Sequence, residues 1–239
     1  MSDHGKMLII KAGSKLPSLA SIEGDFEDWM MSAMGISPNN CQVVSVATGQ
    51  ILPDSKNIAG VIITGSSAMV TDKNEWIEST ASWLREISKQ KIPVLGICFG
   101  HQLLAYAFGG KVANNPKGVE VGTTTAQFTD AASEDTLLAG LNDLPVQTSH
   151  RQCVLQLPNE AIGLASTSMD EHHAFCYQEH IWGVQFHPEF TQEVTRHYIT
   201  YYEPDLQKAG MDSASLKHNC TETPLAQGLL KKFFKLTSI

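Results

Sequence analysis

The sequence lacks the features that mark several large classes of protein. Lys and Arg number 17 against 25 Asp and Glu, which gives a formal net charge of -8. Binding to a phosphate backbone needs a basic face, so we expect no nucleic-acid partner. The N-terminus, MSDHGKMLIIKAG, contains only a short apolar run behind polar and acidic residues. We therefore expect no signal peptide, no membrane partner and a cytoplasmic location.

Cysteine is scarce and shows no paired spacing. The five cysteines are Cys41, Cys98, Cys153, Cys176 and Cys220, and no two of them form a CxxC pair. An odd number with this spacing predicts neither a disulfide framework nor a zinc knuckle, and it fits a reducing cytosol.

Repeats, low-complexity tracts and linkers are also missing, and 42% of the residues are apolar. A chain of 239 residues with this content can bury one large core. We expect a single domain over residues 1–239, with a helical C-terminal extension from about residue 190.

The first half of the chain alternates short apolar runs with helical patterns. Apolar residues have helical spacing in Gly24–Met34 and in Asn74–Gln90, where Asn74 is the expected N-cap. The apolar runs between them are Met7–Ala12, Gln42–Val46, Gly60–Thr64 and Ile92–Ile97. This alternation predicts an α/β fold with a mostly parallel central sheet flanked by helices.

From Lys111 onward the pattern changes to closely spaced β runs, which predict an additional antiparallel or mixed β portion. Pro224–Leu236 is an amphipathic closing helix with lysines near its C-terminal end. The predicted strands are Glu120–Phe128, Val146–Ser149, Cys153–Leu157, Ala161–Ala165, His172–Tyr177 and Ile181–Phe186.

The segment Pro93–Gly110, PVLGICFGHQLLAYAFGG, predicts a nucleophile elbow around Cys98. An apolar strand runs into G-x-C-x-G and then into a helix, so the thiol would project from a sharp turn. Gly96 and Gly100 leave room for the crowded backbone on either side. At the start of the following helix, Cys98 would also lie at the positive end of the helix dipole, which favours a thiolate.

A second motif, GVQFHPEF, supplies the partners that a nucleophile needs. His187 can accept the thiol proton and Glu189 can orient the imidazole. A cysteine taken alone is more often an inert core residue, and an HPE taken alone means little. The two motifs in this order, each after an apolar strand, make a catalytic set the better interpretation.

Other histidines and the tryptophans are interpreted as structural. His101 is expected to point away from the thiol. His172 and His173 would face opposite ways in a strand and lack a third ligand at suitable spacing, so we predict no metal site. The tryptophans, Trp29, Trp76, Trp83 and Trp182, are expected to anchor the core.

The ordered pair LGICFGHQ and GVQFHPEF closely resembles the class I, or triad, glutamine amidotransferases. This resemblance implies a flavodoxin-like fold without a cofactor and a triad of Cys98, His187 and Glu189. In the family the cysteine attacks the side-chain amide of glutamine, ammonia leaves, and water hydrolyses the γ-glutamyl thioester.

The resemblance also implies where the oxyanion of the tetrahedral intermediate is bound. The backbone N–H of Phe99, directly after the nucleophile, is the first expected donor. The second comes in the family from a glycine-rich turn after the third strand, here at Gly65 and Ser66. The family sequence at this turn is GGP, so the serine departs from the pattern.

Glutamine recognition in the family uses positions that correspond to Gln102, Ser149 and His150. The chain is most similar to the amidotransferase part of GMP synthase and its free-standing relatives, and it contains no Gly-rich nucleotide loop. We therefore expect a glutamine-hydrolysing enzyme that passes ammonia to a separate synthetase subunit. The alternatives are a γ-glutamyl peptidase with the same triad, whose substrate is a γ-glutamyl compound, and a non-catalytic regulatory module of the same fold.

Overall fold

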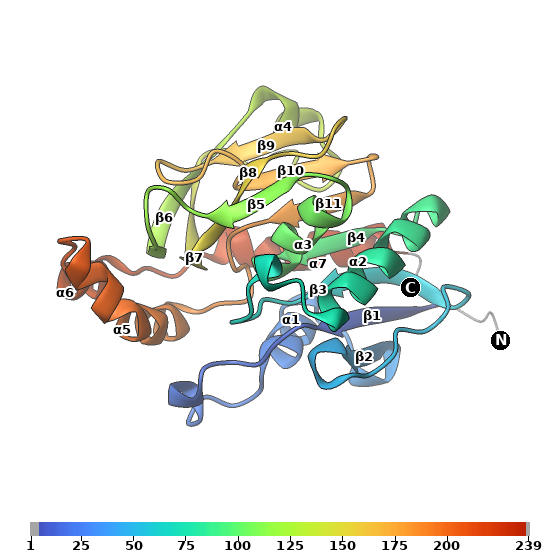
Figure 1. Cartoon of the computed structure of the whole chain (residues 1–239), viewed down its shortest axis with the longest axis horizontal. Coiled ribbons are helices and arrows are strands. Elements are labelled where there is room, and N and C mark those ends of the chain that lie inside the picture. Colours follow the sequence, from blue (N-terminus) through green and yellow to red (C-terminus); the bar gives the residue numbers. More distant parts are fainter. Residues whose placement is uncertain (1–4, 238–239) are drawn as a thin grey trace.

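The computed structural model describes residues 5–237 and contains a large sheet with helices on both faces (Figure 1). The strands are β1 Lys6–Lys11, β2 Cys41–Ser45, β3 Ile58–Ile63, β4 Val94–Ile97, β5 Lys111–Asn114, β6 Glu120–Phe128, β7 Leu144–His150, β8 Gln152–Gln156, β9 Ile162–Ser166, β10 Ala174–Tyr177 and β11 Ile181–Val184. Nine of them form one sheet in the order β2-β1-β3-β4-β11-β10-β9-β6-β7, and β5 pairs with β8 in a small antiparallel sheet.

The large sheet has two halves that differ in strand direction. From β2 to β11 all neighbouring strands are parallel, and from β11 to β7 they are antiparallel. Strand β4 lies within the parallel half, and its four residues are all buried. A parallel strand covered on both faces has this continuous apolar character. The predicted fold class, a parallel helix-flanked sheet with an added antiparallel portion, is confirmed.

Helices cover the two faces of the parallel half as two pairs. The α-helices are α1 Phe26–Met34, α2 Glu75–Ile87, α3 Phe99–Ala107, α4 Asp130–Glu134, α5 Gln192–Lys208, α6 Ser213–Asn219 and α7 Pro224–Leu236. Helices α1 and α7 contact each other and share a buried cluster with Met7 and Ile9, whereas α2 and α3 share the opposite cluster with Leu8 and Ile10. Alternate residues of β1 therefore pack into the two core layers on opposite faces of the sheet.

The remaining helices lie around the antiparallel half and at the ends of strands. Helices α5 and α6 pack together beside β6 and β7 at one end of the molecule (Figure 1). Five short 3₁₀ turns complete the elements: η1 Pro17–Leu19, η2 Pro38–Asn40, η3 Val46–Thr48, η4 Val70–Asp72 and η5 Ser88–Gln90. Among residues 5–237, no helix combines the length and the apolar character needed to cross a membrane.

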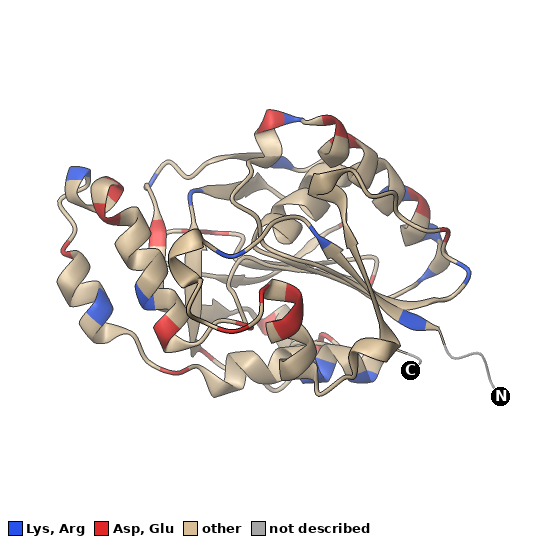
Figure 2. Cartoon of the chain, turned by 90° about the horizontal axis from the view of Figure 1, so that it is seen from below, with Lys and Arg blue, Asp and Glu red and all other residues tan. Residues whose placement is uncertain are grey.

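Local chemistry explains several helix boundaries. The Asp25 side chain caps α1 in a capping box with Asp28, and Gly35, at φ 72°, ends the helix in the left-handed region. Asn74 precedes α2 as predicted, but its side chain makes no capping hydrogen bond. The bounds of α7 are those predicted from its amphipathic pattern. Charged residues lie mostly on helices and loops, and few lie on strands (Figure 2).

Candidate active site

Cys98 lies on a sharp turn between β4 and α3. Its backbone has φ 51° and ψ -99°, a conformation that residues with a side chain rarely adopt. The two flanking glycines explain why the turn can close. A Cβ on Gly96 would lie 2.4 Å from the carbonyl oxygen of Gly100, and a Cβ on Gly100 would lie 2.5 Å from that of Ile63. The turn is the strand-to-helix elbow that the sequence predicts.

The thiol of Cys98 lies at the N-terminus of α3, whose first residue is Phe99. Cys98 is only 5% exposed, and its Sγ donates to the backbone oxygen of Ser149 at 3.6 Å. Its backbone N–H donates to Val184 of β11 at 2.9 Å, which ties the elbow to the neighbouring strand. The sulfur thus lies at the N-terminal end of α3, where the sequence predicts it.

Four neighbours hold His187 in place in the turn that follows β11. Its Nδ1 lies 2.8 Å from Oε1 of Glu189, and its ring stacks on Phe190 with centroids 3.9 Å apart. Its backbone N–H donates to the oxygen of Gln147 at 2.8 Å. A Cβ on Gly65 would come within 2.9 Å of His187 Cε1, so the loop after β3 closes against the imidazole.

The charges around His187 favour its protonated form. Burial alone would lower its pKa, but the charges of Glu189 and Cys98 and the hydrogen bonds to both raise it to about 10. A histidine between a thiol and a carboxylate can hold the proton taken from the thiol while the carboxylate orients its ring. The three side chains therefore have the arrangement of a nucleophile, a base and an orienting group.

Cys98 and His187 open into a cavity of about 280 Å³. One part of its lining comes from Ser14 and Leu16, in the segment that joins β1 to α1, and from Phe26, the first residue of α1. The other lining residues are Ser66, Ser67, Met69, Ser149, Arg151, Tyr198, Tyr201 and Tyr202.

The wall formed by Arg151 and the tyrosines of α5 was missed in the sequence. Tyr198, Tyr201 and Tyr202 have the i, i+3, i+4 spacing of one helix face, which is the signal that could have identified them. Arg151 pairs with Asp205 at 2.8 Å, and its guanidinium lies 5.5 Å from the ring centroid of Tyr202. Within the described part of the chain, Arg151 and His187 are the only side chains lining this cavity that can carry a positive charge.

The loop after β3 lies at the cavity, as the resemblance implies for an oxyanion site. The Ser66 hydroxyl donates to the oxygen of Ala12 at 2.8 Å and accepts from the N–H of Ala68 at 3.1 Å. Thr64 accepts from the N–H of Ala12 at 3.0 Å. These bonds fix the backbone of Gly65 and Ser66 against β1 and leave the serine hydroxyl occupied. The Ser66 hydroxyl thus helps to hold the loop in place.

Two predicted substrate contacts do not line the cavity. The Gln102 side chain is buried and donates to the backbone oxygen of Gln152 at 2.7 Å and to Gln185 at 3.0 Å. His150 is buried, with one ring nitrogen 3.0 Å from the oxygen of Gln152 and the other 2.8 Å from Glu120. Both side chains are turned into the protein behind Ser149, so their positions do not support direct contact with a substrate.

The other four cysteines lie outside the cavity, and all five are free thiols. Burial raises the pKa of Cys41 to about 11, and it raises the pKa of Cys153 and of Cys176 to about 12. Burial also raises the pKa of Cys220. These thiols are protonated at neutral pH. From the sequence, Cys153, Cys176 and Cys220 are interpreted as packing or surface residues, and all three are buried.

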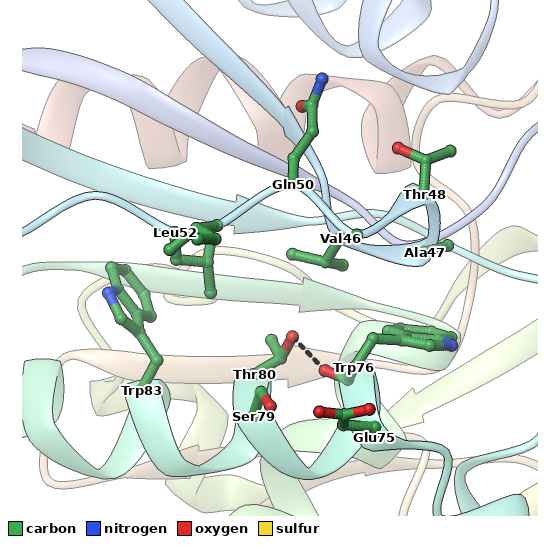
Figure 3. A pocket seen from close by; sticks show the side chains of 12 residues that line it. Val46, Ala47, Thr48, Gln50, Leu52, Glu75, Trp76, Ser79, Thr80 and Trp83 are labelled. Atoms are coloured by element: carbon green, nitrogen blue, oxygen red, sulfur yellow. Dashed lines mark hydrogen bonds between the residues drawn. The ribbon is translucent and has the colours of Figure 1, made fainter.

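A larger open groove of about 600 Å³ lies between η3 with its following loop and α2 (Figure 3). Trp76 and Trp83 line it, so these tryptophans flank a groove instead of lying fully within the core, as Trp182 does. The Thr80 hydroxyl is bonded to the backbone oxygen of Trp76. Among residues 5–237, Glu75 is the only titratable side chain in this groove, which therefore offers no nucleophile paired with a base.

The structure corrects two expectations for His173: that it lies within a strand, and that no third metal-ligating side chain lies near it. Strand β10 begins at Ala174, so His172 and His173 precede the strand, and His173 is fully buried. Donor atoms of Glu120, His150 and His173 lie within 4.8 Å of one another. Because both ring nitrogens of His150 are already engaged in hydrogen bonds, we interpret the group as a hydrogen-bonded polar cluster and not as a set of metal ligands.

Comparison with known proteins agrees with this fold and site. The family Glutamine amidotransferase class-I matches residues 29–203. The chain belongs to this family, whose members are generally hydrolytic enzymes. A crystal structure of a glutamine amidotransferase from Thermotoga maritima has a TM-score of 0.75 at 21% identity, over 97% of each chain, which shows the shared fold.

Relatives of known sequence fall into more than one functional group. A Saccharomyces cerevisiae relative, itself named only after the family, is 35% identical over 57% of this chain and 55% of its own length. The chain thus spans about half the length of that relative. γ-Glutamyl peptidase 5 of Arabidopsis thaliana is 29% identical over 81% of this chain and 79% of its own. A Methanothermobacter thermautotrophicus relative, named as one subunit of a glutamine-hydrolysing GMP synthase, is 30% identical over 64% of this chain and 83% of its own.

Proposed function

We propose that the chain hydrolyses the side-chain amide of glutamine as a stand-alone, GMP-synthase-like glutamine amidotransferase. The observation that carries this proposal is that Cys98 and His187 line one cavity and that Nδ1 of His187 lies 2.8 Å from Oε1 of Glu189. The strained backbone of Cys98 adds support, because such strain concentrates at functional sites.

The first chemical step is attack of the sulfur on the amide carbon of glutamine. His187 takes the thiol proton, the S–C bond forms, and the carbonyl electron pair moves onto oxygen. The backbone N–H of Phe99 and a backbone N–H of the Gly65–Ser66 turn are the proposed donors to this oxyanion. Glu189 accepts from Nδ1 and so directs the other ring nitrogen toward the thiol.

The second half of the reaction regenerates the enzyme. The C–N bond breaks, ammonia leaves with the proton from His187, and a γ-glutamyl thioester remains on Cys98. His187 then takes a proton from water, the resulting hydroxide attacks the thioester carbon, and the C–S bond breaks. Glutamate is released, and the sulfur recovers its proton from His187.

We also propose that the ammonia passes to a separate synthetase subunit. The archaeal relative is named as one subunit of a glutamine-hydrolysing GMP synthase. We expect slow hydrolysis of glutamine by the isolated chain under this function, because docking of the synthetase would supply the final arrangement of the oxyanion donors.

A second candidate is hydrolysis of a γ-glutamyl peptide by the same three residues. The wall of Arg151 and the α5 tyrosines favours it, because the leaving amino acid of a γ-glutamyl dipeptide carries a carboxylate that a guanidinium can pair with. The relative named as γ-glutamyl peptidase 5 also aligns over 81% of the chain.

Steady-state kinetics on the isolated chain distinguish the two candidates. Ammonia release from glutamine and amino-acid release from a panel of γ-glutamyl dipeptides are measured with the wild type and with Cys98→Ser as a matched control. If a dipeptide exceeds glutamine in kcat/KM by more than about 10²-fold, nearly 3 kcal/mol in transition-state binding, the peptidase replaces the ammonia donor. If the wild type turns over neither substrate faster than Cys98→Ser, both candidates are wrong.

A further inference from the structure

His150 lies at the C-terminal end of β7, directly after Ser149 and directly opposite Glu120 of β6 in the sheet register. Its side chain is 1% exposed and that of Glu120 is 5% exposed. Nδ1 lies 3.0 Å from the backbone oxygen of Gln152, and Nε2 lies 2.8 Å from Oε2 of Glu120. Both nitrogens of a fully buried imidazole therefore face oxygen atoms.

The partners of His150 decide where its protons are. The backbone oxygen of Gln152 can only accept, so Nδ1 must carry a proton. The contact with Glu120 then holds one further proton, either on Nε2 beside a carboxylate or on Glu120 beside a neutral imidazole. The first form is a buried ion pair and the second is a neutral pair.

The surroundings favour the ion pair. Burial raises the pKa of Glu120, but the hydrogen bond to His150, the nearby His173 and a hydrogen bond to Thr167 outweigh it, so the net shift is downward. Burial lowers the pKa of His150, but the hydrogen bond and the charge of Glu120, with a contribution from the charge of Asp170, reverse this and raise it. A carboxylate that accepts several hydrogen bonds stays ionised even when it is buried.

The charged and titratable groups around His150 come from several elements. Glu120 lies on β6, and Asp170 and His173 lie in the segment before β10. His101 of α3 is neutral at ordinary pH, because burial lowers its pKa to about 3. Cys98 also acts on His150, since a negative sulfur favours the protonated imidazole.

The backbone on both sides of His150 supports the elbow. The oxygen of Ser149, one residue before it, accepts from the thiol of Cys98 at 3.6 Å. The oxygen of Gln152, two residues after it, accepts from Gln102 of α3 at 2.7 Å as well as from His150 itself. A rigid His150 thus fixes two backbone oxygens that contact the nucleophile and the helix behind it.

We infer that His150 is a positioning residue that remains doubly protonated at neutral pH and, paired with Glu120, holds the Ser149–Gln152 segment against Cys98. The cation also stabilises a negative sulfur, because opposite charges attract strongly where water is excluded. This role rests on the proposed function for Cys98, but it assigns His150 a task that involves no contact with substrate.

Nitrogen NMR of the full chain labelled with ¹⁵N-histidine tests the charge state without any substrate. The signals of His150 are identified by their loss in His150→Gln. We expect both ring nitrogens to carry protons from pH 6 to pH 8 in the wild type, and Glu120→Gln to leave only one protonated. A wild-type His150 with one bare nitrogen at pH 7 overturns the inference, whatever the activity of the enzyme.

Two kinetic readouts test the positioning role in His150→Gln and Glu120→Gln. We expect kcat to fall on the order of tenfold with KM changed less than about twofold, because neither side chain lines the cavity. Iodoacetamide should alkylate Cys98 about tenfold more slowly at pH 7 in both variants, as measured by peptide mapping. This second readout needs no turnover, so it separates failure of this inference from failure of the proposed function.

His172→Gln is the matched control, since it removes a neighbouring, half-buried histidine that has no side-chain partner in the cluster. We expect wild-type kinetics and wild-type alkylation from it. If His150→Gln and Glu120→Gln fold, as judged by circular dichroism, and alkylate at the wild-type rate, the positioning role is wrong. If His150→Gln does not fold, the His150 signals are identified by their change in Glu120→Gln, and that variant and the wild-type spectrum decide the outcome. An unfolded Glu120→Gln would overturn a role confined to the site.

Discussion

Replacing glycine by alanine should change the stability of the protein in opposite directions at two helical positions. Gly100 lies in the first turn of α3 and Gly228 lies within α7. Neither has a positive φ, so alanine at either site gains about 0.5–1 kcal/mol from the reduced freedom of the unfolded chain. The space around each glycine then decides whether the substitution stabilises or destabilises the protein.

At Gly228 a Cβ would meet no atom within 4 Å, so only the gain remains. At Gly100 it would lie 2.5 Å from the oxygen and 2.8 Å from the Cβ of Ile63 in β3. Overpacking of this kind costs about 1–3 kcal/mol, and two rigid backbone segments place Gly100→Ala toward the upper end. We expect a net loss of about 2 kcal/mol for Gly100→Ala and a gain of up to about 1 kcal/mol for Gly228→Ala.

Thermal unfolding followed by circular dichroism measures both effects. For a chain of this size about 1 kcal/mol shifts Tm by roughly 2–4 °C, so Gly100→Ala should lower Tm by about 4–8 °C and Gly228→Ala should raise it by up to about 4 °C. To relieve the contact with Ile63, α3 must shift, and Cys98 shifts with it. We therefore expect kcat to fall on the order of tenfold in Gly100→Ala and to stay unchanged in Gly228→Ala. An unchanged or raised Tm in Gly100→Ala would refute the close packing of the elbow against β3.

Three further outcomes follow from the site. An electrophilic glutamine analogue should label Cys98 alone among the five cysteines, as shown by peptide mapping, because burial keeps the other four thiols protonated; a second labelled cysteine would contradict this. His187→Ala should reduce glutamine hydrolysis nearly as much as Cys98→Ser, and Glu189→Gln should reduce it less, because an orienting group contributes less than the base; equal losses across the pH range would assign Glu189 a larger role. Because the pKa of His187 is raised to about 10, its stabilising contribution is complete below its ordinary value of 6.5 and is lost as pH rises through about 10. The free energy of unfolding, measured in urea, should therefore fall more between pH 7 and pH 10 in the wild type than in His187→Gln, and parallel curves would contradict the raised pKa.

Much of the fold was predictable because local pattern and tertiary environment agree. Strand β6 and helix α7 have the bounds that their periodicity predicts, and the elbow at Cys98 follows from an apolar strand that meets two glycines. His187 and Glu189 meet in a turn and not in an extended segment, yet their spacing still brings the two side chains together.

For other residues the sequence does not predict the surroundings, because the direction of each side chain depends on which neighbour fills the space beside it. Gln102 follows Cys98 by about one helical turn, and its sequence position cannot say whether it faces the cavity or the backbone of Gln152. His173 was assigned to a strand that begins one residue later, and its burial depends on Glu120, which lies far away in the sequence. The α5 tyrosines became part of the site only through the packing of that helix against β6 and β7.

The base and much of the cavity wall lie on one continuous stretch of chain, from His187 through α5, whereas the nucleophile lies on the buried parallel half of the sheet. The tyrosines of the cavity wall therefore lie on a different segment from Cys98, although they follow His187 along the chain. Under the proposed function, we expect substitutions on the cavity face of α5 to change which leaving group is accepted and to leave Cys98 in place, because the geometry of Cys98 depends on β4, β11 and the flanking glycines and not on that helix.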